Sequence, residues 1–165
     1  MSRSRTIPDD HVFAATRALL AEQGTVTFGA VAAATGLAAS TLAQRYGSVA
    51  GMSEAALTPV LARQEMILAK AAAEPASARQ GAQDLLKALA DSDLAEIGVL
   101  GAIFRAPALK QRAEDWRYGV ETALAAHLGS ADAARMVFAA WQGQALWHPA
   151  GGKGFRLKDL VKRLT

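Results

Sequence analysis

The segment TFGAVAAATGLAASTLAQRYGS, residues Thr27–Ser48, decides the fold of this chain. Two short runs of helix-forming residues are separated by Gly36, a residue that tolerates the positive φ of a tight turn. Ala32, four residues earlier, is small enough to let two helices cross closely. Leu37 and Leu42 then supply apolar contacts after the turn and inside the second run. The spacing predicts a helix-turn-helix, with an ordinary alanine-rich helical hairpin as the alternative.

In a helix-turn-helix, the outer face of the second helix enters the major groove of DNA. Here that face carries Ser40, Thr41, Gln44 and Arg45. Gln44 suits the edge of adenine and Arg45 that of guanine, because their donor patterns match these bases. The alternative for Arg45 is a solvated surface arginine.

Two more hydroxyl residues, Thr27 and Ser48, stand where helices are predicted to begin. A hydroxyl at that place either caps the helix or reaches a phosphate oxygen. Both roles stay open from the sequence. The N-terminal arm, with Arg3 and Arg5, is a further candidate for contact with a DNA groove or backbone.

The rest of the chain is predicted to be all-α, with about nine helices. Alanine and leucine dominate an apolar share of 52%, and both favour helices. Apolar residues at steps of three and four after Pro8 predict a first helix that ends at Gly24. Later helices are predicted over residues 49–73, 78–90, 108–128, 131–148 and 156–164, and a further helix is predicted to end at residue 104. A kink or break is predicted at Pro59, inside the first of these helices.

Composition argues against several classes of protein. The 165 residues include no cysteine, which excludes disulfides, thiolate metal sites and a cysteine nucleophile. The three histidines, at 11, 127 and 148, have no ligand spacing. The run Gly151–Gly154 lacks the length and the Ser/Thr of a phosphate-binding loop. The sequence therefore predicts no enzyme, no metal and no cofactor.

Charge and hydropathy predict a cytoplasmic protein without a membrane span. No apolar run approaches the roughly 18 residues that a spanning helix needs, and Pro8, Asp9 and Asp10 occupy the place of a signal peptide's apolar stretch. The net charge is +3, but Arg45 is the single charged residue between Thr27 and Ser48. The electrostatic footprint expected of a DNA binder is therefore faint.

Three stretches resemble the tetracycline-repressor (TetR) family of bacterial regulators. FAATRALLAEQG (13–24) resembles its first helix, TFGAVAAATGLAASTLAQRYGSVAGMSEAAL (27–57) its next three, and GFRLKDLVKRL (154–164) its last. The resemblance implies a homodimeric, ligand-responsive repressor that binds a palindromic DNA operator. It also implies a helix-turn-helix DNA-binding domain at 1–48 and a helical ligand-sensing and dimerisation domain at 49–165.

The chain departs from the family pattern at three positions that usually contact phosphates. Gly29 replaces a frequent basic residue, Ala43 a tyrosine and Val49 a lysine. Because phosphate contacts supply much of the affinity for DNA, we expect weakened binding. The alternative function is therefore a dimer of the same fold that has weak or lost DNA binding and binds a small molecule or a protein partner.

For the second domain, the resemblance implies a dimer made by the last two helices and a pocket for a small apolar ligand. One side of the 131–148 helix offers small residues and a large anchor for the dimer, namely Ala133, Val137, Ala140, Trp141 and Gln144. The pocket candidates are Met66, Phe104, Trp116, Val120 and His127. For both sets, ordinary core packing within one chain is the alternative.

Overall fold

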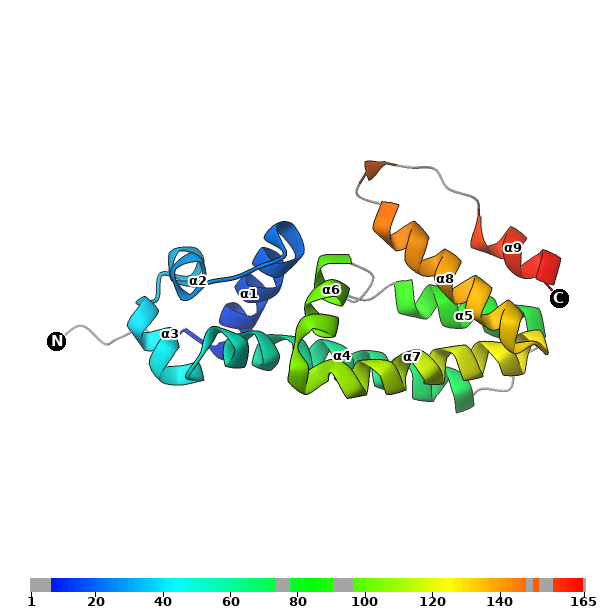
Figure 1. Ribbon diagram of the computed structural model, residues 1–165, viewed down its shortest axis with the longest axis horizontal. Coiled ribbons are helices and arrows are strands. Elements are labelled where there is room, and N and C mark those ends of the chain that lie inside the picture. Colours follow the sequence, from blue (N-terminus) through cyan, green and yellow to red (C-terminus); the bar gives the residue numbers. More distant parts are fainter. Residues whose placement is uncertain (1–6, 74–77, 91–96, 148–149, 152–155, 165) are drawn as a thin grey trace. The chain divides into compact units, whose positions relative to one another are not determined.

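The structure is a computed structural model that describes residues 7–73, 78–90, 97–147, 150–151 and 156–164. These residues form nine helices and no strand, so the predicted all-α class is confirmed (Figure 1). The helices are α1 (Asp9–Gln23), α2 (Phe28–Thr35), α3 (Ala39–Tyr46), α4 (Val49–Ala73), α5 (Ala78–Ala90), α6 (Ile97–Arg105), α7 (Pro107–Leu128), α8 (Ala131–Trp147) and α9 (Leu157–Leu164).

The chain divides into two compact units. The head unit comprises Met1–Val60 and Gly98–Lys110, and the body unit comprises Leu61–Ile97 and Gln111–Thr165. The head unit thus holds α1 to α3, most of α6 and the beginnings of α4 and α7. It extends beyond residue 48, where the sequence places the end of the DNA-binding domain, and that functional boundary stays a prediction.

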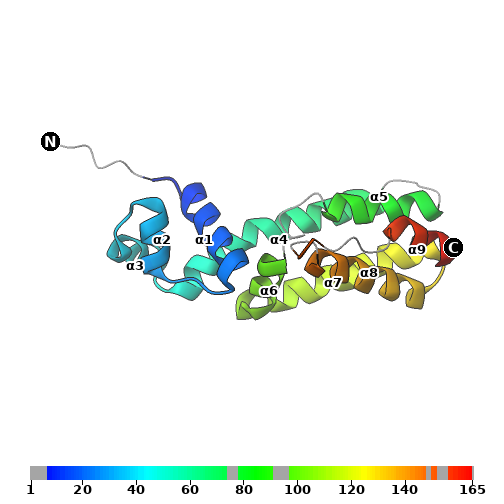
Figure 2. The ribbon, with the colours of Figure 1, turned by 90° about the horizontal axis from the view of Figure 1, so that it is seen from above.

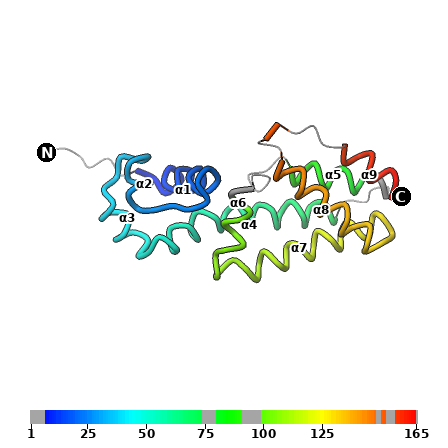
Figure 3. Tube along the Cα trace, turned by 45° about the horizontal axis from the view of Figure 1, so that its top comes forward, coloured from blue at the N-terminus to red at the C-terminus, as the bar shows by residue number. Residues whose placement is uncertain are grey.

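One residue from each of the first four helices forms the core of the head unit. Val12, Val31, Leu42 and Met52 are completely buried there. Apolar side chains that include Phe28, Ala32 and Leu37 pack around them. α2 packs against both α1 and α3, and Figure 3 shows the three helices following one another around this core.

Local capping sets the ends of the head helices as predicted. The Thr27 hydroxyl accepts a hydrogen bond from the backbone N–H of Ala30 at 3.1 Å, and the Ser48 hydroxyl accepts one from that of Gly51 at 3.0 Å. Gly36 ends α2 with φ of 74°, in the left-handed region. A glycine is favoured there by conformation alone, since a Cβ on Gly36 would meet nothing within 4 Å.

α4 continues through Pro59, so of the predicted kink or break the break is wrong, and the kink stays a prediction. Proline removes one backbone hydrogen bond from a helix, but apolar neighbours on both sides of Pro59 are buried. Leu57 is 1% exposed and Leu61 is completely buried, whereas Pro59 itself is exposed. Packing of those neighbours offsets the cost of the missing bond and keeps the helix continuous.

The body unit is built around aromatic side chains of α7 and α8. The Phe138 ring meets Trp116 edge-on at 5.9 Å between centroids and stacks on Trp141 at 5.7 Å. All three are buried. α9 packs against α5 and α8, and the three lie together in Figure 2.

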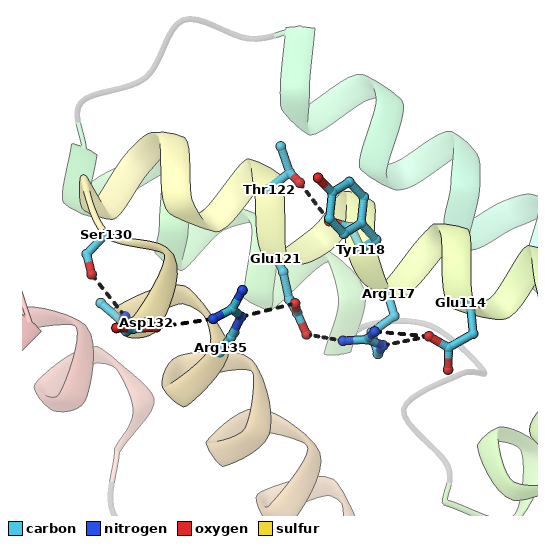
Figure 4. Close-up of polar contacts among 9 residues, drawn as sticks. Glu114, Arg117, Tyr118, Glu121, Thr122, Ser130, Asp132 and Arg135 are labelled. Atoms are coloured by element: carbon cyan, nitrogen blue, oxygen red, sulfur yellow. Dashed lines mark hydrogen bonds and ion pairs between the residues drawn. The ribbon is translucent and has the colours of Figure 1, made fainter.

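A row of charged side chains runs along α7 and continues onto α8 through the pair Glu121–Arg135 (Figure 4). Arg117 contacts Glu114 at 3.0 Å and Glu121 at 2.6 Å. Glu121 in turn lies 3.9 Å from Arg135, which pairs with Asp132 at 3.2 Å. The Glu121–Arg135 pair gives the start of α8 a contact with α7, and the Ser130 hydroxyl caps α8 by accepting a hydrogen bond from the backbone N–H of Ala133 at 3.2 Å.

Several sequence predictions lie outside the described residues. They concern Arg3, Arg5 and His148, a stop between helices that the sequence predicts at residues 74–77, a helix cap that it predicts at 91–93, and a loop that it predicts from Pro149 through the glycines at 152–154. Within the described residues, no helix has the length and hydropathy to cross a lipid bilayer.

Candidate nucleic-acid interface

The predicted reading face lies on one side of α3. Ser40, Gln44 and Arg45 are exposed and Thr41 is half-buried, whereas Leu42 on the other side is completely buried. The helix thus presents hydroxyl, amide and guanidinium groups to solvent while its apolar side fixes it to the head core. The structure brings these four predicted residues together.

Arg45 also has a structural role that sequence reasoning did not find. Its guanidinium donates to the backbone carbonyl of Ile7 at 3.2 Å and pairs with the Asp9 carboxylate at 3.2 Å. The Tyr46 hydroxyl donates to the same carboxylate. Asp9 therefore ties the end of α3 to the start of α1.

The phenol of Tyr46 is a stable donor in this arrangement. Burial raises the pKa of Tyr46 above its ordinary value, and the hydrogen bond to Asp9 raises it further. The phenol therefore remains protonated at neutral pH and keeps its bond to the carboxylate. The Arg45 guanidinium has its own pKa raised, first by the hydrogen bond with Tyr46, and stays charged.

The start of α3 has an accessible backbone. Its N-cap is Ala38, which provides no side-chain hydrogen bond, and Ala38, Ala39 and Ser40 are all exposed. Backbone N–H groups at such a helix start suit a phosphate oxygen. Thr27 and Ser48 are exposed as well, although their hydroxyls already cap α2 and α4.

Cations are scarce on the described part of the head. Residues 7–60 contain two arginines against four carboxylates. Arg17 donates to the Ala56 carbonyl at 3.2 Å, and Arg45 is paired with Asp9. At the positions where the family usually has phosphate contacts, Gly29 is exposed, and Ala43 and Val49 are half-buried. Residues 7–60 therefore lack the basic surface that drives unspecific DNA binding.

Another arginine of the head unit reinforces α1 from a distant part of the chain. Arg105, at the end of α6, donates to the Gly24 carbonyl at 3.0 Å. Gly24 is the C-cap of α1, so this bond satisfies a carbonyl at the helix end and gives α6 a polar contact with α1.

The predicted ligand residues do not gather in one place. Trp116 and Val120 are buried in the body unit, with 3% and 0% exposure, and His127 is half-buried against Gly81. Met66 is 68% exposed and Phe104, which belongs to the head unit, is 43% exposed. None of the five lines any of three cavities that lie among the described residues.

The predicted dimer residues divide between the interior and the surface of α8. Ala133, Val137 and Trp141 are buried within the chain itself, which corresponds to the alternative of core packing. Ala140 and Gln144 remain half-buried. The neighbouring face of the helix exposes Met136 at 53% and Trp147 at 65%, two residues that the sequence prediction did not include.

Metal-binding residues do not cluster in the part of the chain that the structure describes. No group of three or more histidine, cysteine, aspartate or glutamate side chains is placed there to hold a metal ion. The polar groups with the clearest functional arrangement are those on α3.

Solved structures with the same fold are transcriptional regulators or a drug-binding protein. The fatty acid degradation regulator FadR from Bacillus halodurans aligns with a TM-score of 0.64 at 16% identity, over 98% of this chain and 94% of that one. A proposed transcriptional regulator from Pseudomonas aeruginosa gives 0.67 at 18%, over 98% and 89%. The multidrug binding protein EbrR, solved with imidazole, gives 0.60 at 20%, over 96% and 95%.

These similarities show the fold, since the identities are low. No protein-family model matches the sequence, and no curated protein matches it. The chain therefore shares an all-helical fold with these three proteins.

Proposed function

We propose that this protein is a DNA-binding transcriptional regulator that reads DNA with α3. The carrying observation is the exposed row of Ser40, Gln44 and Arg45 on a helix whose Leu42 is locked in the head core. Gln44 and Arg45 reach base edges, and the accessible start of α3 and the hydroxyls of Thr27, Thr41 and Ser48 receive phosphate oxygens. The regulator names among the similar structures support this assignment.

We further infer a TetR-type homodimer that uses the exposed side of α8. Met136, Ala140, Gly143 and Trp147 follow one another at steps of four, three and four, so they share a face. A Cβ on Gly143 would meet nothing within 4 Å, which leaves room for a second helix to approach. Because α8 is apolar on this side as well as on its buried side, a second copy is the partner that suits it.

The regulator is proposed to be a repressor that responds to a small ligand in the body unit. FadR and EbrR are named for fatty acid degradation and for multidrug binding. A ligand acts by favouring one separation of the two heads, which must lie about 34 Å apart to enter successive major grooves.

A second candidate is a dimer of this fold that binds a ligand or protein and no longer binds DNA strongly. The scarcity of cations among residues 7–60 favours it, since Arg45 and Arg17 are both engaged within the chain. This candidate predicts weak binding that is independent of DNA sequence and disappears with salt.

The test is binding of the purified protein to labelled fragments of its own genomic DNA, at low and at physiological salt. Selective binding at the higher salt supports the regulator. Gln44→Ala should then abolish selectivity, whereas Gln23→Ala, an exposed glutamine at the end of α1, should retain it. Arg45 is unsuitable here because its substitution also removes the contact with Asp9. Binding that is unselective and lost with salt would favour the second candidate.

A further inference from the structure

A cavity of about 390 Å³ lies between α5, α8 and α9 in the body unit. Its size falls within the range of about 300–1,000 Å³ that is common for small-molecule sites. Leu86 of α5, Trp141 of α8 and Val161 of α9 are buried and form apolar walls. The cavity is separate from the residues that the sequence predicted for a ligand.

Two lysines give this apolar cavity a positive edge. Lys87 on α5 and Lys158 on α9 line it, and both are exposed. No carboxylate is among its described lining residues. The nearest acid along α9, Asp159, pairs with Arg156 at 2.8 Å. Lysine ammonium groups that edge an apolar space attract an anion with an apolar body.

Amide groups complete the polar part of the lining. Gln83 of α5 and Gln144 of α8 both line the cavity and are half-buried. An amide both donates and accepts hydrogen bonds, so it orients a carboxylate but does not select for its charge. Discrimination between an anion and a neutral molecule therefore rests on the two lysines.

We propose that this cavity binds an amphipathic organic anion, such as a medium-chain carboxylate. The apolar chain lies against Leu86, Trp141 and Val161, and the carboxylate lies between Lys87 and Lys158. The bound anion would connect α5 to α9 through charges that both helices supply. Any effect on DNA rests on the proposed function, whereas binding of the anion does not.

The test is calorimetric titration of the full chain with three probes of equal chain length: octanoate, 1-octanol and octyltrimethylammonium. Octanoate should bind most tightly and the cation most weakly. Replacing both lysines, Lys87→Gln with Lys158→Gln, should weaken octanoate binding about tenfold, since each exposed charge pair contributes modestly. The matched control, Lys110→Gln with Lys162→Gln, removes two exposed lysines outside the cavity and should leave binding unchanged.

A second variant tests the apolar part. Ala145 lines the cavity from α8, so Ala145→Phe should fill it and reduce binding of octanoate and octanol together, with circular dichroism confirming the helices. Equal octanoate affinity in the lysine variant and its control, or equal affinity of the anion and the cation, would overturn the proposal. If the protein binds octanoate with these preferences but shows no selective binding to genomic DNA, the proposed anion site is supported and the proposed DNA-binding function is rejected.

Discussion

The head unit and the body unit reach stability by different means. The head places one buried apolar residue from each of four helices in a small core and sets its helix ends with nearby hydroxyls and glycines. The body buries three large aromatic rings and joins its helices by ion pairs such as Glu65–Arg112, at 2.7 Å between α4 and α7. The helix ends of the head are set by local bonds, although Arg45 with Asp9 and Arg105 with Gly24 also join residues far apart in the sequence, as Glu65 with Arg112 does in the body.

This difference affects how function can be located in each unit. In the head, local structure puts a buried leucine and exposed polar residues on opposite sides of α3, and the candidate site follows. In the body, α8 has apolar residues on more than one side, and packing decides which of these sides is interior. The predictions below test this contrast.

The largest effect is expected from Phe138→Ala. Phe138 is 2% exposed and contacts both Trp116 and Trp141, so its removal should lower the free energy of unfolding by about 3–5 kcal/mol. Chemical denaturation measures the change. Met66→Ala, at a site 68% exposed, should change stability by less than about 0.5 kcal/mol; similar losses for both variants would contradict the described body core.

Gly143→Arg tests the proposed dimer face of α8. Because a side chain has room at Gly143 within one chain, the fold should persist while two arginines repel each other across the interface. Analytical sedimentation should show that the dissociation constant of the dimer rises about a hundredfold, since like charges that face each other cost several kcal/mol. Thr122→Arg, exposed on α7, is the control for charge, and an unchanged dimer in both variants would reject this face.

A matched pair of glycine substitutions tests the local determinants of the head. Gly36→Ala forces a side chain into φ of 74° and should destabilise the protein by about 1–2 kcal/mol. Gly29→Ala lies within α2, where its Cβ meets only Thr27 Oγ1 at 3.9 Å, and should stabilise by up to about 1 kcal/mol. Thermal unfolding should separate the two in opposite directions; shifts of the same sign would contradict the local description.

Val49→Lys tests whether missing phosphate contacts limit DNA binding. A lysine at this half-buried position at the start of α4 should strengthen DNA binding several-fold. The slope of log affinity against log salt concentration should become steeper by about one. Gln142→Lys on α8 adds the same charge in the body unit. If Val49→Lys and Gln142→Lys strengthen DNA binding equally, the gain in affinity comes from net charge and not from a phosphate contact beside α3.

The smallest effect concerns the pH dependence of the Asp9–Tyr46 contact. Since the pKa of Tyr46 is raised by burial and by Asp9, its contribution to stability is complete below the ordinary tyrosine pKa of about 10 and is lost as pH rises through the higher folded value. The stability advantage over Tyr46→Phe should therefore shrink from pH 9 upwards, as measured by denaturation at a series of pH values in that range. A constant difference would mean that the phenol does not titrate in this way.

Local interactions explain how much could be predicted from the sequence. The helix over 78–90 begins and ends as predicted, and the caps at Thr27, Ser48 and Ser130 bond to N–H groups three residues away. Gly36 has the positive φ that its place in the turn required. These features depend on neighbours in the chain, so composition and spacing determine them. The all-α class and the polar outer face of α3 follow from the same rules.

Only the tertiary structure decided which distant groups meet. It pairs Arg45 with Asp9, 36 residues away, which gives a predicted DNA contact a second role in the head. It buries Ala133, Val137 and Trp141 and exposes Met136 and Trp147 on the same helix. It also brings Lys87 and Lys158 to one cavity. Hydrophobic spacing shows that a helix has an apolar side. How the helices pack decides which residues cover that side and which group each charged side chain meets.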